Sequence, residues 1–108
     1  MNIRYNLAGM FLPINPANNK PVFLTICGKF LLPIFTTEDK LKVAAEWGNF
    51  TFAIPKSILD PVDFTNSVLN FKKNLAFHVV VDPYINEKGN TEFQMIPFDE
   101  EERKLGEI

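Results

Sequence analysis

One histidine and one cysteine are the side chains best suited to chemistry in this sequence. His78 lies between two apolar residues and has the imidazole of a general base that works near neutral pH. A base also needs an orienting acid, and Asp82, four residues along the same expected strand, would be about 13 Å away. Cys27 has no histidine or cluster of cations beside it that would activate its thiol. We therefore predict that His78 is a buried structural residue and that Cys27 is a packed, unreactive thiol.

Acidic residues and glycines supply no metal or cofactor motif. The run 99–102 holds four acids, but on a helix they would point in diverging directions and would not converge on one ion. Segment 82–87 lacks the Asp-x-Asp-x-Asp-Gly order of a calcium loop. The five glycines are isolated, so the sequence has no phosphate loop or dinucleotide fingerprint. We predict no catalytic residue, no metal and no cofactor, and a protein that is not an enzyme.

The charge and cysteine content restrict the partners. Eleven Lys and Arg against thirteen Asp and Glu leave a net charge of -2, whereas nucleic-acid binders carry a basic stripe. A single cysteine forms neither an intramolecular disulfide nor a cysteine zinc site, which is typical of a reducing compartment. No apolar run approaches the roughly 18 residues of a membrane span, and Pro13 interrupts the run 7–12 early. We expect a cytoplasmic protein without nucleic-acid or membrane partners.

Phenylalanine is unusually frequent, with eleven copies in 108 residues. Core filling explains most of them, but a small sheet cannot hide all those that come from its strands. The residues concerned are Phe11, Phe23, Phe30, Phe50, Phe52, Phe93 and Phe98. Some should lie in an interface or an apolar groove. Aromatic residues are enriched at dimer interfaces, so we expect contacts from segments 50–54 and 91–96, with Phe52 and Phe93 as anchors. The interface candidates are Phe50, Phe52, Phe93 and Met95.

Length and patterning predict one domain spanning residues 1–108, with a core of its own. Segments 10–14 and 22–27 read as strands on either side of a polar turn cluster. Gly28-Lys29 then separates 22–27 from 30–35, and a two-residue loop that begins with glycine fits a type II′ hairpin turn. Pro33 lacks an N–H, which indicates that the second arm ends early, bulges or lies at an edge.

Two helices are predicted from their capping residues. A threonine hydroxyl of Thr36-Thr37 can cap a helix over about Glu38–Trp47, and Gly48 suits the left-handed residue that ends one. Asp60 followed by Pro61 marks the start of a second helix. Phe64, Val68 and Phe71 follow at i, i+4, i+7 spacing, which indicates a buried stripe along it. This second helix is expected to end near Asn74.

Three further segments complete the expected secondary structure. Residues 50–54 read as a strand closed by Pro55, and 75–81 as a central strand covered on both faces. Thr91–Ile96 alternates apolar and polar residues, as a strand with one wet face does. The tail 99–108 suits either a short exposed helix or a frayed terminus.

The expected fold is α+β, with a mixed sheet of five or six strands in the order β-β-β-α-β-α-β-β and a short C-terminal helix. Right-handed crossovers over 35–50 and 54–75 would place both helices mainly on one face of that sheet. The other face would need a cover, which favours an interaction module acting as a homodimer, with another protein as a further option. The first alternative is a binder of a small apolar or aromatic ligand on a Phe-rich face, and the third is an enzyme without a recognisable motif.

Segment 30–39 reads Phe-Leu-Leu-Pro-Ile-Phe-Thr-Thr-Glu-Asp, with Leu41 and Trp47 downstream. It resembles the start of the SseB N-terminal domain family, the enhanced-serine-sensitivity proteins, which have an apolar strand, a Pro-x-Phe-Thr-Ser-Glu-Glu turn and a helix. Segment 80–83 is similar to that family's apolar strand closing in Asn-Pro, with Asp82 in place of asparagine. The resemblance covers about 22–83. It implies a bacterial cytoplasmic α/β domain without an assigned enzymatic site, so it transfers no catalytic residue.

Overall fold

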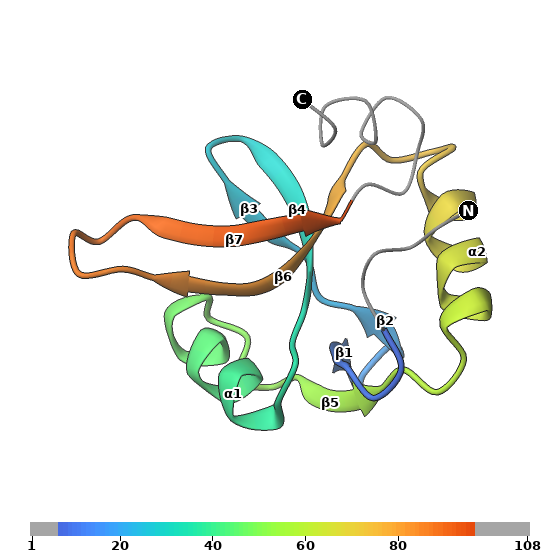
Figure 1. The fold of residues 1–108 in the computed structure, drawn as a ribbon, viewed down its shortest axis with the longest axis horizontal. Helices are drawn as coiled ribbons and strands as arrows, with labels where there is room; N and C mark the ends of the chain where they lie inside the picture. The colour runs from blue at the N-terminus through green and yellow to red at the C-terminus, as the bar shows by residue number, and fades with distance from the viewer. Residues whose placement is uncertain (1–6, 97–108) are drawn as a thin grey trace.

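The computed structural model describes residues 7–96, which form an α+β domain with two helices (Figure 1). The α+β class predicted from the sequence is confirmed, whereas the expected C-terminal helix lies outside the described residues. In chain order the elements are β1 (Phe11–Asn15), β2 (Lys20–Pro21), β3 (Leu24–Ile26), β4 (Lys29–Ile34), α1 (Glu38–Trp47), β5 (Ile54–Ser57), α2 (Pro61–Phe71), β6 (His78–Ile85) and β7 (Thr91–Ile96).

The strands form two sheets instead of the single sheet that the sequence predicts. One sheet has three strands in the order β2-β1-β5, and the other has four in the order β3-β4-β6-β7. All neighbours are antiparallel except β4 and β6, which run parallel. A bridge joins the sheets: the N–H groups of Phe11 and Phe35 each donate to the other residue's carbonyl, at 2.8 and 2.9 Å. Phe11 therefore links β1 to the end of β4.

The helices cover opposite faces of the four-stranded sheet, so the prediction of two helices on one face is wrong. Leu31, Phe35 and Val80 point to one face and pack with Leu41 of α1. Side chains one residue out of phase, such as Val79, point to the other face and pack with Val68 of α2. We name these the α1 face and the α2 face. Between α1 and α2 the chain leaves the four-stranded sheet, and β5 pairs with β1 of the three-stranded sheet (Figure 1). After α2 the chain re-enters the four-stranded sheet as β6.

Both helices begin where their caps predict. The Thr37 hydroxyl accepts from the Lys40 N–H at 3.2 Å, and the bounds Glu38–Trp47 are confirmed. The Asp60 carboxylate accepts from two N–H groups of the first turn of α2, at 3.0 and 3.1 Å. The ends differ from expectation. Gly48 is right-handed and the left-handed residue is Asn49 (φ 60°), while α2 ends with a cap at Lys72 and not at Asn74.

The β3–β4 hairpin turns through Cys27 (φ 53°) and Gly28 (φ 75°). Two consecutive positive φ angles define a type I′ turn, so the predicted type II′ turn is wrong. Cys27 is consequently exposed at the tip and not packed. Pro33 lies where β4 changes neighbours, because pairing with β3 stops at Leu31 and the bridge to Phe11 begins only at Phe35. Its missing N–H therefore costs no hydrogen bond on that side.

Two predicted strands are shifted along the chain. Segment 50–54 is a turn up to Ala53, and β5 starts at Ile54 and runs through Pro55. The shift arises because Phe50 turns into the core, where it lies so close to Gly48 that a Cβ there would be 2.6 Å from the ring. The expected central strand 75–81 begins only at His78 and continues to Ile85. It does so through a β-bulge between Val81 and Tyr84.

Candidate functional site

The four sheet edges differ in how well they could pair with another chain. Three of them are short or carry proline, which blunts an edge. β2 has two residues and ends at Pro21, β3 has three residues, and β5 contains Pro55. β7 has six residues, Thr91–Ile96, with neither proline nor glycine. Within residues 7–96 it is thus the one long edge whose outer side has no strand neighbour.

The hairpin that leads into β7 determines which of its peptide groups face outward. The Gly89 N–H donates to the Asn86 carbonyl at 3.0 Å, and Gly89 has a φ of 81°. The Asn86 N–H then donates to the Asn90 carbonyl at 2.8 Å, so the peptide groups of Asn90 face β6. Because this orientation alternates along an antiparallel strand, the groups of Thr91, Phe93 and Met95 face away from β6.

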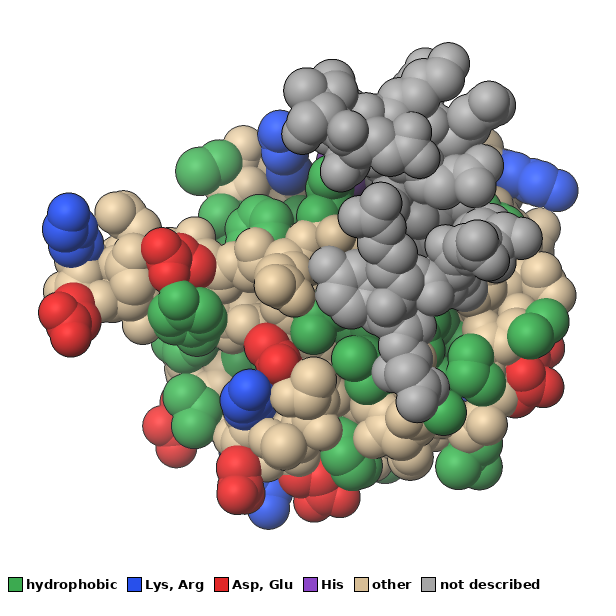
Figure 2. Space-filling model, viewed as in Figure 1, with side chains coloured by type: hydrophobic (Ala, Val, Ile, Leu, Met, Phe, Trp, Pro, Cys, Tyr) green, Lys and Arg blue, Asp and Glu red, His purple; other side chains and the backbone are tan. Residues whose placement is uncertain are grey.

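The β6–β7 hairpin projects from the body of the domain, with apolar side chains at its surface (Figures 1 and 2). Tyr84, Ile85 and Phe93 are exposed on it, Phe93 by 40%. The Tyr84 hydroxyl donates to the Glu92 carboxylate across the two strands. This hydrogen bond, with the negative charge of Glu92, raises the pKa of Tyr84 above its usual value near 10.

Asp82 anchors the base of this hairpin to the start of α1. Its backbone is left-handed (φ 48°), and its carboxylate accepts from the Thr36 N–H and the Thr36 hydroxyl, both at 2.8 Å. The Lys40 ammonium donates to the same carboxylate at 3.3 Å. Since Asp82 is bound in this way, it is a structural anchor of the bulge.

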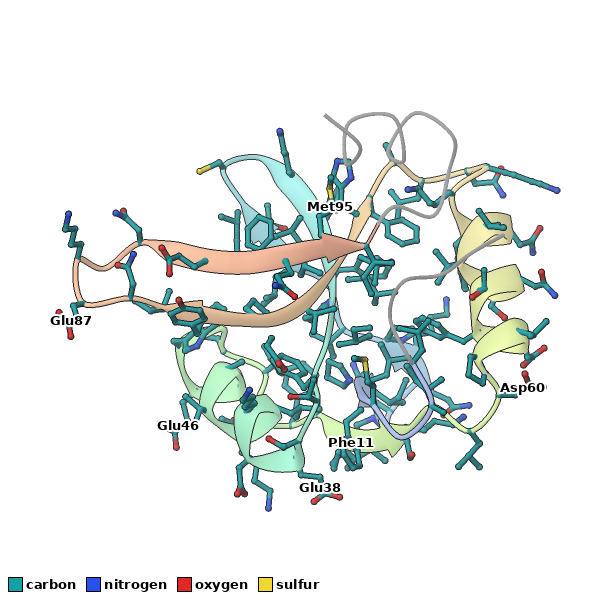
Figure 3. The ribbon with its side chains drawn as sticks, viewed as in Figure 1. Phe11, Glu38, Glu46, Asp60, Glu87 and Met95 are labelled. Carbon is teal, nitrogen blue, oxygen red and sulfur yellow. The ribbon has the colours of Figure 1, made fainter. Side chains whose placement is uncertain are left out.

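The four predicted interface residues are not brought together. Phe50 is 1% exposed and fills the core of the α1 face. Phe52 is 53% exposed, in the turn that precedes β5 of the three-stranded sheet. Phe93 and the half-buried Met95 both lie on β7, where Figure 3 labels Met95. The surface candidates thus divide between β7 and a turn outside the four-stranded sheet.

A second candidate surface is an apolar groove of about 620 Å³ between α2 and the strands β1, β2 and β5. We name it the α2 groove. Leu12, Ile14 and Leu32 contribute to its lining from the sheets, and Val68 contributes from α2. Its four aromatic rings come from Phe23, Phe64, Phe71 and Phe77. Two of them, Phe23 and Phe77, meet edge to face with 5.2 Å between ring centroids.

Charged residues also line the α2 groove. Lys20 and Lys56 are both exposed, and within the described part of the chain neither ammonium has an ion-pair partner. The Lys72 ammonium lies 5.8 Å from the centroid of the Phe77 ring. The acids are Asp60, whose carboxylate already caps α2, and the exposed Asp63. The lining of the groove therefore combines apolar side chains with two lysines and two acids.

His78 and Cys27 lie at different places in the four-stranded sheet. His78 is half-buried at the start of β6, opposite Leu31, whereas Cys27 is at the exposed tip of the β3–β4 hairpin. Residues 7–96 contain no cluster of three His, Cys, Asp or Glu side chains able to hold a metal ion. In the same residues, neither helix has the length and apolar character needed to cross a bilayer.

Sequence reasoning found the excess of phenylalanine but missed the residues that line the α2 groove. Of the seven phenylalanines singled out from the sequence, six lie within residues 7–96, and of these six only Phe23 lines the groove. Phe64 and Phe71 were assigned to a buried helical stripe, yet Phe71 is 54% exposed. The helical spacing of Phe64 and Phe71, together with Phe77 just before a strand, was the available signal.

Comparisons of the chain with protein-family models, with curated proteins and with solved structures give no match.

Proposed function

We propose that this protein is a non-enzymatic interaction module that forms a homodimer by pairing β7 with β7 of a second copy. The observation that carries the proposal is the contrast between the sheet edges. β2, β3 and β5 are short or contain proline, and β7 is six residues long and contains none. An unprotected edge strand is a template for pairing with another chain. In a cyclic dimer the same strand serves both copies.

Antiparallel pairing centred on Phe93 fits the chemistry of β7. Phe93 has outward-facing peptide groups, so two copies can exchange both N–H···O bonds at this position. Thr91 would then lie opposite the partner's Met95, and Glu92 opposite the partner's Gln94. No like charges oppose each other in this register, and the two Phe93 rings form an aromatic cross-strand pair. The two four-stranded sheets would become one continuous sheet.

Three further parts of the proposal concern the compartment, the lack of catalysis and the likeness to a family. A single, unpaired cysteine suits a reducing, cytoplasmic compartment. Residues 7–96 hold no group of three His, Cys, Asp or Glu side chains that could bind a metal ion, and His78 and Cys27 share no site, which supports a role other than catalysis. The passage from β4 through Thr37 into α1 supports likeness to the bacterial SseB N-terminal domains, because that family has the same succession of strand, threonine-containing turn and helix.

Light scattering after size exclusion tests the dimer. We expect a mass of about 25 kDa, twice the 12.4 kDa of the chain. Phe93→Lys places a charge at the two-fold axis and should return the mass to that of one chain. Phe52→Lys is the matched control, because Phe52 is an exposed phenylalanine outside β7. It should leave the mass doubled.

A single-chain mass for the unchanged protein at high micromolar concentration would refute the proposal. Loss of the dimer in Phe52→Lys and not in Phe93→Lys would place the interface elsewhere. Circular dichroism and a thermal melt of both variants ensure that a change in mass is not a consequence of unfolding.

A further inference from the structure

We propose that residues 1–6 of this chain fold back over β1 and occupy the α2 groove. These residues precede the described part of the chain, and their sequence is Met-Asn-Ile-Arg-Tyr-Asn. The inference goes beyond the dimer and is independent of it, because none of the residues that line the groove belongs to β7.

A turn at the start of the described chain sets the direction of the residues before it. The Met10 N–H donates to the Leu7 carbonyl at 3.1 Å. Gly9 has a φ of 82°, the value that a type II turn requires at its third residue. Because such a turn reverses the chain, residues 1–6 are directed back along β1.

Both edges of β1 are occupied, so the returning segment has no strand position beside it. On one side β5 pairs with β1 over residues 11–14. On the other side lie β2, the bridge to Phe35, and the N–H of Val22, which donates to the Pro13 carbonyl at 2.9 Å. A segment directed back along β1 therefore has to pass over one of its faces.

Leu7 identifies the face. Its side chain is 1% exposed and belongs to the buried cluster that contains Leu12 and Ile14 of β1 and Val68 of α2. The same three residues line the α2 groove. The chain therefore enters the described domain beside the apolar lining of this groove, and the segment before Leu7 starts from there.

The apolar pattern of the segment has the phase that this position requires. The odd-numbered residues of 1–7 are apolar, and the even-numbered residues are polar. Such alternation is typical of an extended segment with one apolar face. Counted back from the turn, Tyr5 comes opposite Leu12. Two residues further on, Ile3 comes opposite Ile14, so apolar side chains of the segment meet the apolar lining of the groove.

The length of the segment and the charge of the groove agree with this occupant. Six extended residues span about 20 Å, and the five residues of β1 span about 17 Å. The groove is lined by two lysines and two acids, so its charges balance. Its apolar residues, among them four phenylalanines, then favour an occupant that contributes apolar side chains.

Serine substitutions in the two phases of the segment test which side of it is buried. Ile3→Ser/Tyr5→Ser should lower the melting temperature of the intact chain by about 5 to 15 °C, because two apolar side chains lose their contacts with the groove. Asn2→Ser/Arg4→Ser is the matched control, since it makes the same number of substitutions in the polar phase. It should change the melting temperature by less than about 2 °C.

Cross-linking tests the location. The background is Cys27→Ser, which removes the single cysteine. Arg4→Cys/Ser67→Cys adds one thiol to the segment and one to an exposed residue of α2 that lines the groove. Arg4→Cys/Lys42→Cys is the control pair, because Lys42 is exposed on α1, which covers the other face of the sheet.

A short bismaleimide should join the first pair within one chain about tenfold more than the control pair, because docking raises the effective concentration of the two thiols. Addition of Ile3→Ser/Tyr5→Ser to the first pair should remove this excess. The mass of the product distinguishes a link within one chain from a link between two.

Three results would overturn the proposal. They are an unchanged melting temperature in Ile3→Ser/Tyr5→Ser, equal yields from the two cysteine pairs, and a product of the first pair with the mass of two chains in place of one. The last result would assign the groove to the segment of a second copy. None of them bears on the β7 dimer, whose readout is the mass of the protein without cross-linker and its response to Phe93→Lys.

Discussion

The two faces of the four-stranded sheet are closed by their helices to different degrees. On the α1 face the helix presents a leucine and two alanines, Leu41, Ala44 and Ala45, and all three are buried. The core beneath it includes Phe35 and Phe50, of which at most 1% is exposed. On the α2 face the helix presents the buried Val68 flanked by Phe64 and Phe71, and the space between α2 and the neighbouring strands remains open as the groove.

The difference follows from the size and placement of the helical side chains. Small residues such as Ala44 allow α1 to lie close to the sheet, where large rings from other elements fill the remaining volume. In α2, by contrast, the large rings belong to the helix itself, and Phe71 at its end stays largely exposed. One helix on each side of the sheet thus leaves a closed core on the α1 face and an open groove on the α2 face.

The largest expected effect compares two phenylalanines, one from each face. Phe50→Ala removes a fully buried ring and should lower the free energy of unfolding by about 3 to 5 kcal/mol. Phe71→Ala removes an exposed one and should cost less than about 1 kcal/mol. Urea unfolding of both variants measures the difference. Equal losses would show that the α2 face is as closed as the α1 face.

A smaller effect is expected where the two helices begin. Asp82→Ala removes hydrogen bonds that join β6 to α1 and should cost about 1 to 3 kcal/mol, most of it from Thr36 because the Lys40 pair is exposed. Asp60→Ala removes only a local cap of α2 and should cost about 1 kcal/mol. Chemical denaturation again gives both values.

Asp82→Asn is the control for backbone strain, because asparagine tolerates the positive φ at this position better than alanine. It should retain part of the stability that Asp82→Ala loses. A larger loss in Asp60→Ala than in Asp82→Ala would show that the local cap of α2 stabilises the fold more than the bonds that join β6 to the start of α1.

The smallest effect concerns the projecting hairpin. In a Tyr5→Phe background Tyr84 is the single tyrosine, and its ionisation can be followed by ultraviolet absorbance. Glu92→Gln should lower the pKa of Tyr84, because it removes the negative charge and the carboxylate acceptor that raise it. Since the raised pKa belongs to the folded state, the contribution of this contact is complete below the unfolded pKa near 10. It is lost as the pH rises through the folded value. An unchanged titration would show that the Tyr84–Glu92 bond does not form in solution.

Local signals allowed the helices to be predicted, whereas the division of the strands between two sheets depends on distant contacts. Thr37 and Asp60 mark helix starts by chemistry confined to a few residues, and both starts are confirmed. Nothing near Phe11 in the sequence reveals its bridge to Phe35. Likewise, Phe50 looks like a strand residue until the close approach of Gly48 is known.

The candidate sites show the same limit. Thr91–Ile96 was predicted as a strand from its alternation, and its bounds are confirmed, but its place at a sheet edge depends on pairings elsewhere. The α2 groove could not be derived from composition, since Phe23 precedes β3 and Phe64 belongs to α2, and only the folded chain brings both to its lining. Sequence periodicity indicates which face of a helix or strand is apolar. It does not indicate whether the neighbouring element covers that face or leaves a groove beside it.

The parallel pairing of β4 with β6 has a consequence for how fast the chain can fold. The β3–β4 and β6–β7 hairpins each join strands that are close in sequence, so each can form by a short loop closure. Their union in one sheet must bring together strands separated by segment 35–77, which contains α1, β5 and α2. Contacts of such long sequence separation raise the contact order and slow the folding of a small domain. The β4–β6 pair, like the pairing of β1 with β5, is therefore expected to make folding slower than it would be in a domain built from hairpins alone.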